Sequence, residues 1–139
     1  MRARIESLTS FDQRLWGRMS AHGMVCHVAD AFRMALGERA TSEATGLFRR
    51  TILKWGALRV PVAWPKDYPT RPELEQGVGG SWPTEFEFDR RELLQLMERF
   101  VATPAGRMAR HPIMGRMSEF EWRRWGYLHT DHHLRQFGR

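Results

Sequence analysis

Three histidines lie within five residues near the end of the sequence, in the segment 129–133, which reads HTDHH. A helix turns about 100° per residue, so His129 and His133 would be one turn apart and about 40° from each other around the axis. Both imidazoles can then reach one point beside the helix, which is the spacing of two metal ligands. The neighbouring His132 is the available candidate for a catalytic general base.

Two imidazoles do not complete a zinc site, which takes three protein ligands when catalytic and four when structural. His27 is the candidate for the third ligand. It lies in the middle of a predicted helix, at the margin of an apolar stripe that includes Met24 and Ala31. An unpaired imidazole buried there would be costly. Three imidazoles around an open position would lower the pKa of a bound water or thiol.

Other residues are predicted to support these ligands. Asp30 and Gln136 could each accept a hydrogen bond from the free N–H of a ligand ring and so fix its tautomer. The predicted wall of the pocket consists of apolar side chains on the same helical faces, namely Met24, Trp122 and Trp125.

Each part of this pattern also has an ordinary interpretation. A single helical histidine is commonly a half-buried residue with a hydrogen-bond partner, and histidine clusters near a terminus occur without a metal. We interpret His22 and His111 as surface residues and Cys26 as a packing residue. The four-residue spacing of Asp131 and Arg135 predicts a structural ion pair.

Helical patterns dominate the rest of the chain. Apolar residues recur at helical intervals over 20–37, 89–103 and 118–137, where Ser20, Asp89 with Glu92, and Ser118 with Glu121 are the predicted N-terminal caps. Weaker patterns predict helices over 2–16 and 44–58. Residues 59–87 contain five prolines and no strand alternation, which predicts a long irregular loop. We therefore expect one all-α domain over 1–139, an antiparallel four-helix bundle with an extra helical segment.

Composition narrows the function classes. The 139 residues are 42% hydrophobic and 27% charged, as in an ordinary globular domain. The net charge is +6, but the arginines are scattered instead of forming a basic patch, so nucleic acid is a disfavoured partner. Because the sequence has one cysteine and lacks an apolar run long enough for a signal peptide or a membrane span, we expect a cytoplasmic protein without membrane association.

Three segments carry a family resemblance: WGRMSAHGMVCHVAD (16–30), HPIMGRMSEFEW (111–122) and HTDHHLRQF (129–137). Together they resemble the DinB-like (DinB/YfiT) metalloenzyme superfamily, in a subfamily of unknown function. The resemblance implies a four-helix bundle that holds a divalent metal, usually zinc or nickel, through His27, His129 and His133. Similar proteins include transferases and isomerases that use low-molecular-weight thiols, and some are homodimers. Leu134 and Arg135 replace the more usual Arg and Gly, so substrate contacts by that arginine do not carry over.

Two hypotheses follow. The first is a metal-dependent enzyme, either a thiol transferase or a hydrolase, in which the open metal position activates a thiol or water against a small-molecule substrate. The second is a non-catalytic helical bundle in which the metal is structural or absent and the arginine-rich exterior binds an acidic partner.

Overall fold

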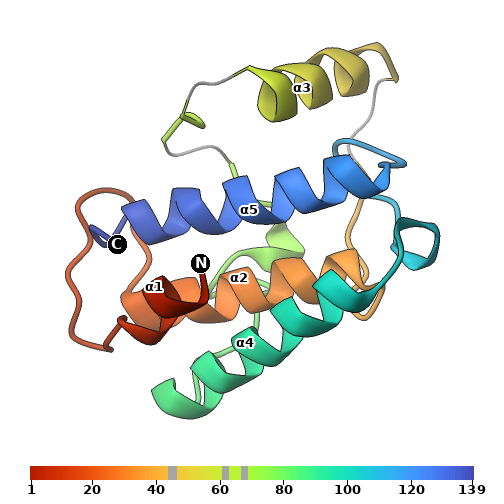
Figure 1. Ribbon diagram of the computed structural model, residues 1–139. Helices are drawn as coiled ribbons and strands as arrows, with labels where there is room; N and C mark the ends of the chain where they lie inside the picture. Colours follow the sequence, from red (N-terminus) through yellow and green to blue (C-terminus); the bar gives the residue numbers. More distant parts are fainter. Residues whose placement is uncertain (44–46, 61–62, 67–68) are drawn as a thin grey trace.

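The computed structural model describes residues 1–43, 47–60, 63–66 and 69–139, and of the side chains in 47–53 only that of Thr51. The described residues form helices and no strand, so the all-α prediction is confirmed (Figure 1). The helices are α1 (Arg2–Glu6), α2 (Ala21–Ala35), α3 (Leu47–Arg59), α4 (Phe86–Ala102) and α5 (Glu119–Arg135), with short 3₁₀ turns η1 (Pro72–Leu74) and η2 (Ala105–Arg107).

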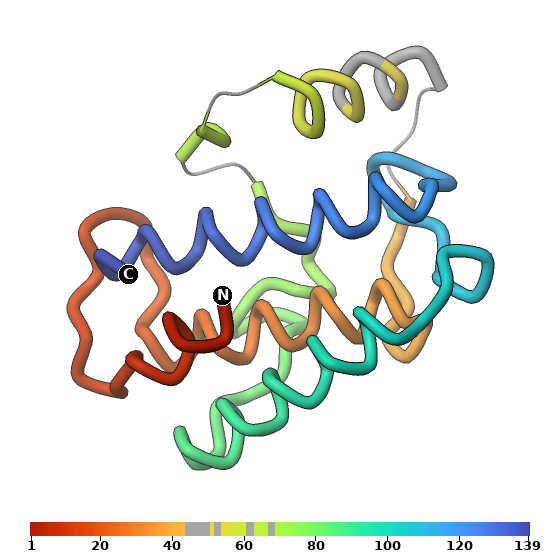
Figure 2. The backbone as a smooth tube through the Cα atoms, in the orientation of Figure 1, coloured from red at the N-terminus to blue at the C-terminus, as the bar shows by residue number. Residues whose placement is uncertain are grey.

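Helix α2 is the centre of the fold. It packs against α4 and α5, while α1 packs on α4 and α3 packs on α5. Helices α2 and α5 run in opposite directions, whereas α2 and α4 run in the same direction (Figures 1 and 2). This arrangement places the middle of α2 opposite the last turns of α5, where the predicted ligands lie.

Helix α2 confirms the prediction for 20–37. The hydroxyl of Ser20 accepts a hydrogen bond from the backbone N–H of Gly23 at 3.0 Å, which satisfies one of the free donors at the start of the helix. The helix ends before Gly37, whose φ of 81° is readily adopted by glycine. Almost every residue between these ends is buried, including the polar His27 and Asp30.

Helix α5 confirms the prediction for 118–137. The Ser118 hydroxyl accepts from the Glu121 N–H, and the Glu121 carboxylate accepts from the Ser118 N–H at 2.8 Å, which forms the predicted capping box. After the helix, Gly138 has a φ of 70°. Both ends of the helix that carries the histidine segment are therefore fixed by local interactions.

Helix α4 begins earlier than predicted. The carboxylate of Glu85, and not that of Asp89, caps the helix by accepting from the N–H groups of Glu87 and Phe88 at 3.0 and 2.7 Å. The side chain of Asp89 instead accepts hydrogen bonds from the backbone N–H and the hydroxyl of Thr84, both at 2.9 Å. The predicted cap at Asp89 was wrong because its carboxylate bonds to the segment before the helix.

The predicted helix over 2–16 was wrong in extent, because α1 ends at Glu6. Residues 7–20 follow an irregular path, and the guanidinium of Arg90 takes the carbonyl oxygens of Glu6 and Leu8 that a longer helix would use itself. Of the range predicted as 44–58, residues 44–46 lie outside the described residues, as do the side chains of Leu47, Phe48 and Ile52. The long connection to α4 contains only the turn η1 among its described residues.

Aromatic side chains join the three central helices. Phe32 of α2 lies edge-on to Phe100 of α4 with ring centroids 5.0 Å apart, and Trp122 and Trp125 of α5 pack on the same cluster. Gly126 allows this approach, because a Cβ atom there would lie 2.8 Å from the Phe100 ring. No described helix combines the length and the apolar character needed to cross a membrane.

Candidate metal centre

Three imidazoles from two helices converge in the structure. His27 comes from the middle of α2, and His129 and His133 lie one turn apart on α5. Each ring offers one nitrogen, and the three nitrogens lie within 4.8 Å of one another. The centroid of His133 is 4.7 Å from that of each other ring. These histidines form a group that could hold a metal ion.

Two of the three rings are oriented by oxygen acceptors. Nδ1 of His27 lies 2.9 Å from the carbonyl oxygen of Leu74, and Nδ1 of His133 lies 2.7 Å from Oε1 of Gln136. Because a carbonyl oxygen only accepts, each ring donates its Nδ1 hydrogen and a neutral ring keeps its lone pair on Nε2. Both Nε2 atoms are therefore prepared to bind a cation, in the arrangement that metal-binding histidines commonly have.

The third ring, His129, has a polar atom without a partner. Its Nδ1 is buried and makes no hydrogen bond with any described residue, while the indole of Trp125 stacks on the ring at 5.2 Å and an angle of 11°. A buried nitrogen without a partner carries a desolvation cost. A metal ion held by the three histidines would interact with their ring nitrogens, one of which otherwise has no partner among the described residues.

The electrostatics of the group favour neutral rings. Burial lowers the pKa of His27 and, well below the ordinary value, those of His129 and His133. The neighbouring imidazoles lower the pKa of His129 and of His133 further, because two positive charges so close would repel each other. Neutral imidazole is the form that binds a metal, so no proton has to be displaced at pH 7.

The three histidines open into a large cavity of about 1300 Å³, which extends from α2 and α5 to the end of α3 and the segment that follows it. A cavity of this size can accommodate a small organic molecule beside the imidazoles. Its tryptophan lining comes from three separate parts of the chain, as Trp16, Trp64 and Trp125. Among its described lining residues, Arg18 and Arg71 are basic and Glu75 is acidic.

The comparison with known families gives one match. The model of a family of proteins of unknown function, DUF1569, matches residues 2–139. The chain belongs to the DUF1569 family. Neither the curated proteins nor the solved structures compared with it include a match.

Of the two residues predicted to support the ligand rings in this DUF1569 protein, Gln136 makes the predicted hydrogen bond to His133. Asp30 does not bond to a ligand ring. Its buried carboxylate accepts from the guanidinium of Arg33 at 2.8 Å and from the backbone and hydroxyl of Ser81, both at 2.7 Å. The prediction for Asp30 was wrong because this carboxylate ties α2 to the segment after η1.

The group that orients His27 is the backbone carbonyl of Leu74. Sequence reasoning missed it, because a carbonyl is present at every residue and its position depends on the path of the loop. The Asp30–Ser81 contact holds the far end of the same segment.

His132 lines the cavity beside the three-histidine group, with its ring centroid 5.2 Å from that of His133. It also lies edge-on to Trp16 at 4.8 Å. Partial burial lowers the pKa of its imidazole. The ring is therefore neutral at pH 7 and borders the cavity, while its predicted role in proton transfer stays a prediction.

The predicted pocket wall is only partly present in the DUF1569 structure. Trp125 lines the cavity, but Met24 and Trp122 belong to the hydrophobic core behind it. Both are about 1% exposed, and Trp122 contacts Phe100 and Trp125. The prediction failed for these two residues because α2 and α5 each border both the core and the cavity, so an apolar side chain on either helix can belong to the core.

His111 and His22 are not the free surface residues that were predicted. His111 is buried, and its Nδ1 accepts from the N–H groups of Ile113 and Met114 at 3.2 and 3.1 Å, in a turn that ends at Gly115. Burial lowers the pKa of His111 to about 3. His22 is partly buried, with Nε2 2.7 Å from Oδ2 of Asp89. Histidines next to a proline or in a first helical turn can thus be internal hydrogen-bond partners.

The burial predicted for Cys26 and the ion pair predicted for Asp131 are both present in the structure. Cys26 is buried, as a packing residue should be. Asp131 pairs with Arg135 at 2.8 Å as predicted, and it also pairs with Arg4 of α1 at 2.7 Å. This carboxylate therefore joins the start of the chain to α5.

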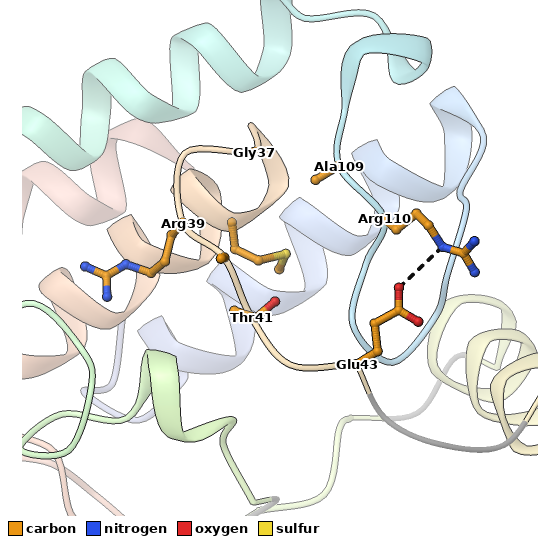
Figure 3. A pocket seen from close by; sticks show the side chains of 8 residues that line it. Gly37, Arg39, Thr41, Glu43, Ala109 and Arg110 are labelled. Atoms are coloured by element: carbon orange, nitrogen blue, oxygen red, sulfur yellow. Dashed lines mark ion pairs between the residues drawn. The ribbon is translucent and has the colours of Figure 1, made fainter.

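A second, smaller cavity of about 220 Å³ lies at the end of α2, beside residues 109–110 (Figure 3). Its charged groups are paired within the protein: Nε of Arg110 lies 3.6 Å from Oε1 of Glu43, and Arg39 donates to the carbonyl oxygen of Gly79. We interpret it as a surface notch between two connecting segments.

Proposed function

We propose that this protein is a metal-dependent enzyme of the DinB-like kind, in which His27, His129 and His133 hold a divalent zinc or nickel ion. The open side of the site would activate a low-molecular-weight thiol or water against a small-molecule substrate. The observation that carries the proposal is the position of three converging imidazoles at the wall of a cavity of about 1300 Å³. Catalytic zinc sites use three protein ligands and keep one position open, whereas structural sites use four.

The proposal also concerns the fold around the site, the cellular location and the binding partners. Helices α2 to α5 would be the four helices of a DinB-like bundle, with α1 as the additional segment. We place the protein in the cytoplasm, where a buried free thiol such as Cys26 stays reduced. A homodimer is compatible with the family resemblance, and nucleic acid is not expected to bind.

Different residues would have different roles at such a site. A bound metal would act as a Lewis acid that lowers the pKa of a thiol or water. Leu74 and Gln136 hold two ligand rings in one orientation, which reduces the reorganisation needed when a ligand binds. Trp16, 4.8 Å from the His132 ring, and Trp64, 6.1 Å from the His129 ring, would present apolar surface to a substrate beside the site.

His132 is the residue that would move a proton. Its neutral ring borders the cavity, so one nitrogen can accept a hydrogen from a substrate or a leaving group and later return it. Arg18 and Arg71 would bind an anionic group of the substrate, since a guanidinium recognises carboxylate or phosphate.

Metal analysis of the untagged protein tests the binding part of the proposal. We expect about one zinc or nickel ion per chain at the three-histidine site. This ion should be lost in His129→Ala and retained in His132→Ala. His132→Ala is the matched control, because it removes an imidazole from the same helix. Wild-type protein that takes up neither ion at neutral pH would contradict the proposal.

Activity measurements test the catalytic part. The metal-loaded protein is assayed with a panel of low-molecular-weight thiols and electrophiles and with a panel of esters. We expect turnover to disappear in His129→Ala. In His132→Ala it should fall about 10²–10⁴-fold, which is the range for loss of a general acid or base. An ion at the three-histidine site that has no exchangeable ligand would instead indicate a structural role.

A further inference from the structure

A second group of metal-ligating side chains lies on another side of α2. His22 and Cys26 are one turn apart near the start of the helix, and Asp89 approaches them from the first turns of α4. The three ligand atoms lie within 4.8 Å of one another. Cys26 and His27 are adjacent in the sequence, but their side chains leave the helix about 100° apart. The group is therefore separate from the three-histidine centre.

One carboxylate oxygen is crowded with donors in this group. Oδ2 of Asp89 lies 2.7 Å from Nε2 of His22, 3.6 Å from Sγ of Cys26 and 2.9 Å from the backbone nitrogen of Thr84. A carboxylate oxygen offers about two lone pairs, so three hydrogens compete for them. The other oxygen, Oδ1, accepts from the Thr84 hydroxyl alone among the described residues. A single cation in place of the imidazole and thiol hydrogens would relieve this competition.

We propose that His22, Cys26 and Asp89 form a second site, which binds a zinc-class divalent cation through imidazole, thiolate and carboxylate. Zinc uses all three ligand types, and the two negative charges of thiolate and carboxylate balance the charge of the ion. On binding, the thiol releases one proton to solvent. His22 would bind through Nε2 as neutral imidazole, with the hydrogen that Nε2 shares with Asp89 lost to solvent and one hydrogen held on Nδ1. No electron transfer is involved.

The burial of the three residues provides a route for the ion. The side chain of His22 is 20% exposed, whereas Cys26 is 4% exposed, so an ion reaches the thiol from the His22 side and retains water as its fourth ligand. Zinc bond lengths of about 2.0–2.3 Å place ligand atoms roughly 3.3–3.6 Å apart in a tetrahedron. The His22 ring, which lies edge-on to Phe86 at 5.4 Å, has to withdraw from Asp89 by less than about 1 Å, a distance that follows from the same bond lengths.

The position of this site gives it a structural role. It bridges the first turns of α2 and α4, two helices that pack along each other through the core. An ion that binds the folded arrangement and not the separated helices stabilises the fold by mass action. The second site would thus stabilise the scaffold on which the three-histidine centre is built.

Cobalt(II) distinguishes the two sites, because only the second contains sulfur. We titrate cobalt(II) into the metal-free, untagged chain, kept reduced by a phosphine and not by a thiol, and record the near-ultraviolet spectrum. The expected result is a thiolate-to-cobalt charge-transfer band that is lost in Cys26→Ala and lost or at least tenfold weaker in cobalt affinity in His22→Ala. His129→Ala, which removes a ligand of the other site, keeps the band. Zinc titration should give two ions in the wild type and one in Cys26→Ala.

Each contrary outcome has a distinct meaning. A cobalt complex without a thiolate band overturns the second site and leaves the three-histidine centre untouched. A band that survives unchanged in His22→Ala, or that disappears in His129→Ala, also overturns it, since the sulfur would then belong to a different ligand set. Circular dichroism of the metal-free variants checks their folding, and His22→Ala, at a partly exposed position, remains informative if Cys26→Ala is unstable.

Discussion

Oε1 of Gln136 lies 2.7 Å from Nδ1 of His133, three residues earlier in the chain, and this contact forms as α5 ends. On its other side the amide lies against the backbone of Gly17. An ideal Cβ at Gly17 would lie 2.6 Å from Nε2 of Gln136. The glycine therefore provides the space that lets this glutamine orient a ligand ring.

Removal of the Gln136 amide should weaken metal binding without unfolding the protein. In Gln136→Ala the His133 ring loses the acceptor that fixes its tautomer, and we expect zinc affinity to fall about 10–100-fold. Gln136→Glu keeps an oxygen acceptor and should retain most of the affinity. Competition with a chromophoric chelator measures both variants. Equal affinities in wild type and Gln136→Ala would show that this hydrogen bond does not tune the site.

A side chain at Gly17 should act on the same ring indirectly. Gly17→Ala puts a methyl group against the Gln136 amide and also strains a backbone with φ of 80°, at a cost of roughly 1–2 kcal/mol. Gly77→Ala is the matched control, because Gly77 has φ of 82° but the added Cβ meets no atom within 4 Å in the described part of the chain beyond its neighbours in sequence. Both variants should lose stability in urea unfolding, and only Gly17→Ala should also lose zinc affinity. Equal zinc affinities in the two would contradict the proposed contact.

The sequence was most informative where the controlling interactions are local. Ser20 and Ser118 mark the starts of α2 and α5, and the spacing of His129 and His133 follows from helix geometry alone. These features need no knowledge of distant contacts. The same locality explains why the Gln136 hydrogen bond could be anticipated, since it spans three residues.

Two of the errors concern residues whose packing depends on segments that are distant in the sequence. Asp30 was assigned to a ligand ring, but its partner Ser81 is 51 residues away. His111 was interpreted as exposed because it precedes a proline in a loop, yet tertiary packing buries it against Trp122 and Trp125. The path of the loop decides such contacts, and neither periodicity nor composition encodes that path.

Loss of the Asp30 charge should affect both stability and the metal centre. Asp30→Asn is close in shape, but it leaves the guanidinium of Arg33 without its buried partner, and breaking a buried pair costs about 3–5 kcal/mol. Because Ser81 is then held less firmly, the segment that presents the Leu74 carbonyl to His27 should loosen and zinc affinity should fall.

Glu92→Gln is the control for Asp30→Asn, because Glu92 is a second partner of Arg33. The side chain of Glu92 is 39% exposed. A pair this accessible to solvent contributes about 0–1 kcal/mol. Urea unfolding should therefore separate the two variants clearly. Similar losses in both would mean that Arg33, and not the buried carboxylate, determines the effect.

Gly126 is predicted to be required by packing. In Gly126→Ala the new Cβ would lie 2.8 Å from the Phe100 ring, and overpacking of this kind costs roughly 1–3 kcal/mol even though alanine favours helices. Gly56→Ala on α3 is the control, because no atom of the described residues beyond its chain neighbours and its own helix backbone lies within 4 Å of the added Cβ. It should gain about 0.5–1 kcal/mol from helix propensity. Thermal or urea unfolding gives both values, and a stabilised Gly126→Ala would refute the packing argument.

His111 should make the fold sensitive to acid. Its native pKa of about 3 lies below the unfolded value of about 6.5, so between these values the unfolded chain takes up a proton that the native ring does not. Stability is therefore complete above about pH 6.5 and falls toward pH 3, by at most about 1.4 kcal/mol per pH unit for this group.

The variant His111→Asn isolates that contribution. An amide oxygen can replace Nδ1 as the acceptor for the N–H groups of Ile113 and Met114, while the titrating ring is removed. Urea unfolding of metal-free protein from pH 8 to pH 4 should show a shallower loss of stability in the variant than in the wild type. Parallel pH profiles of the two proteins would show that His111 is protonated equally in the folded and unfolded states.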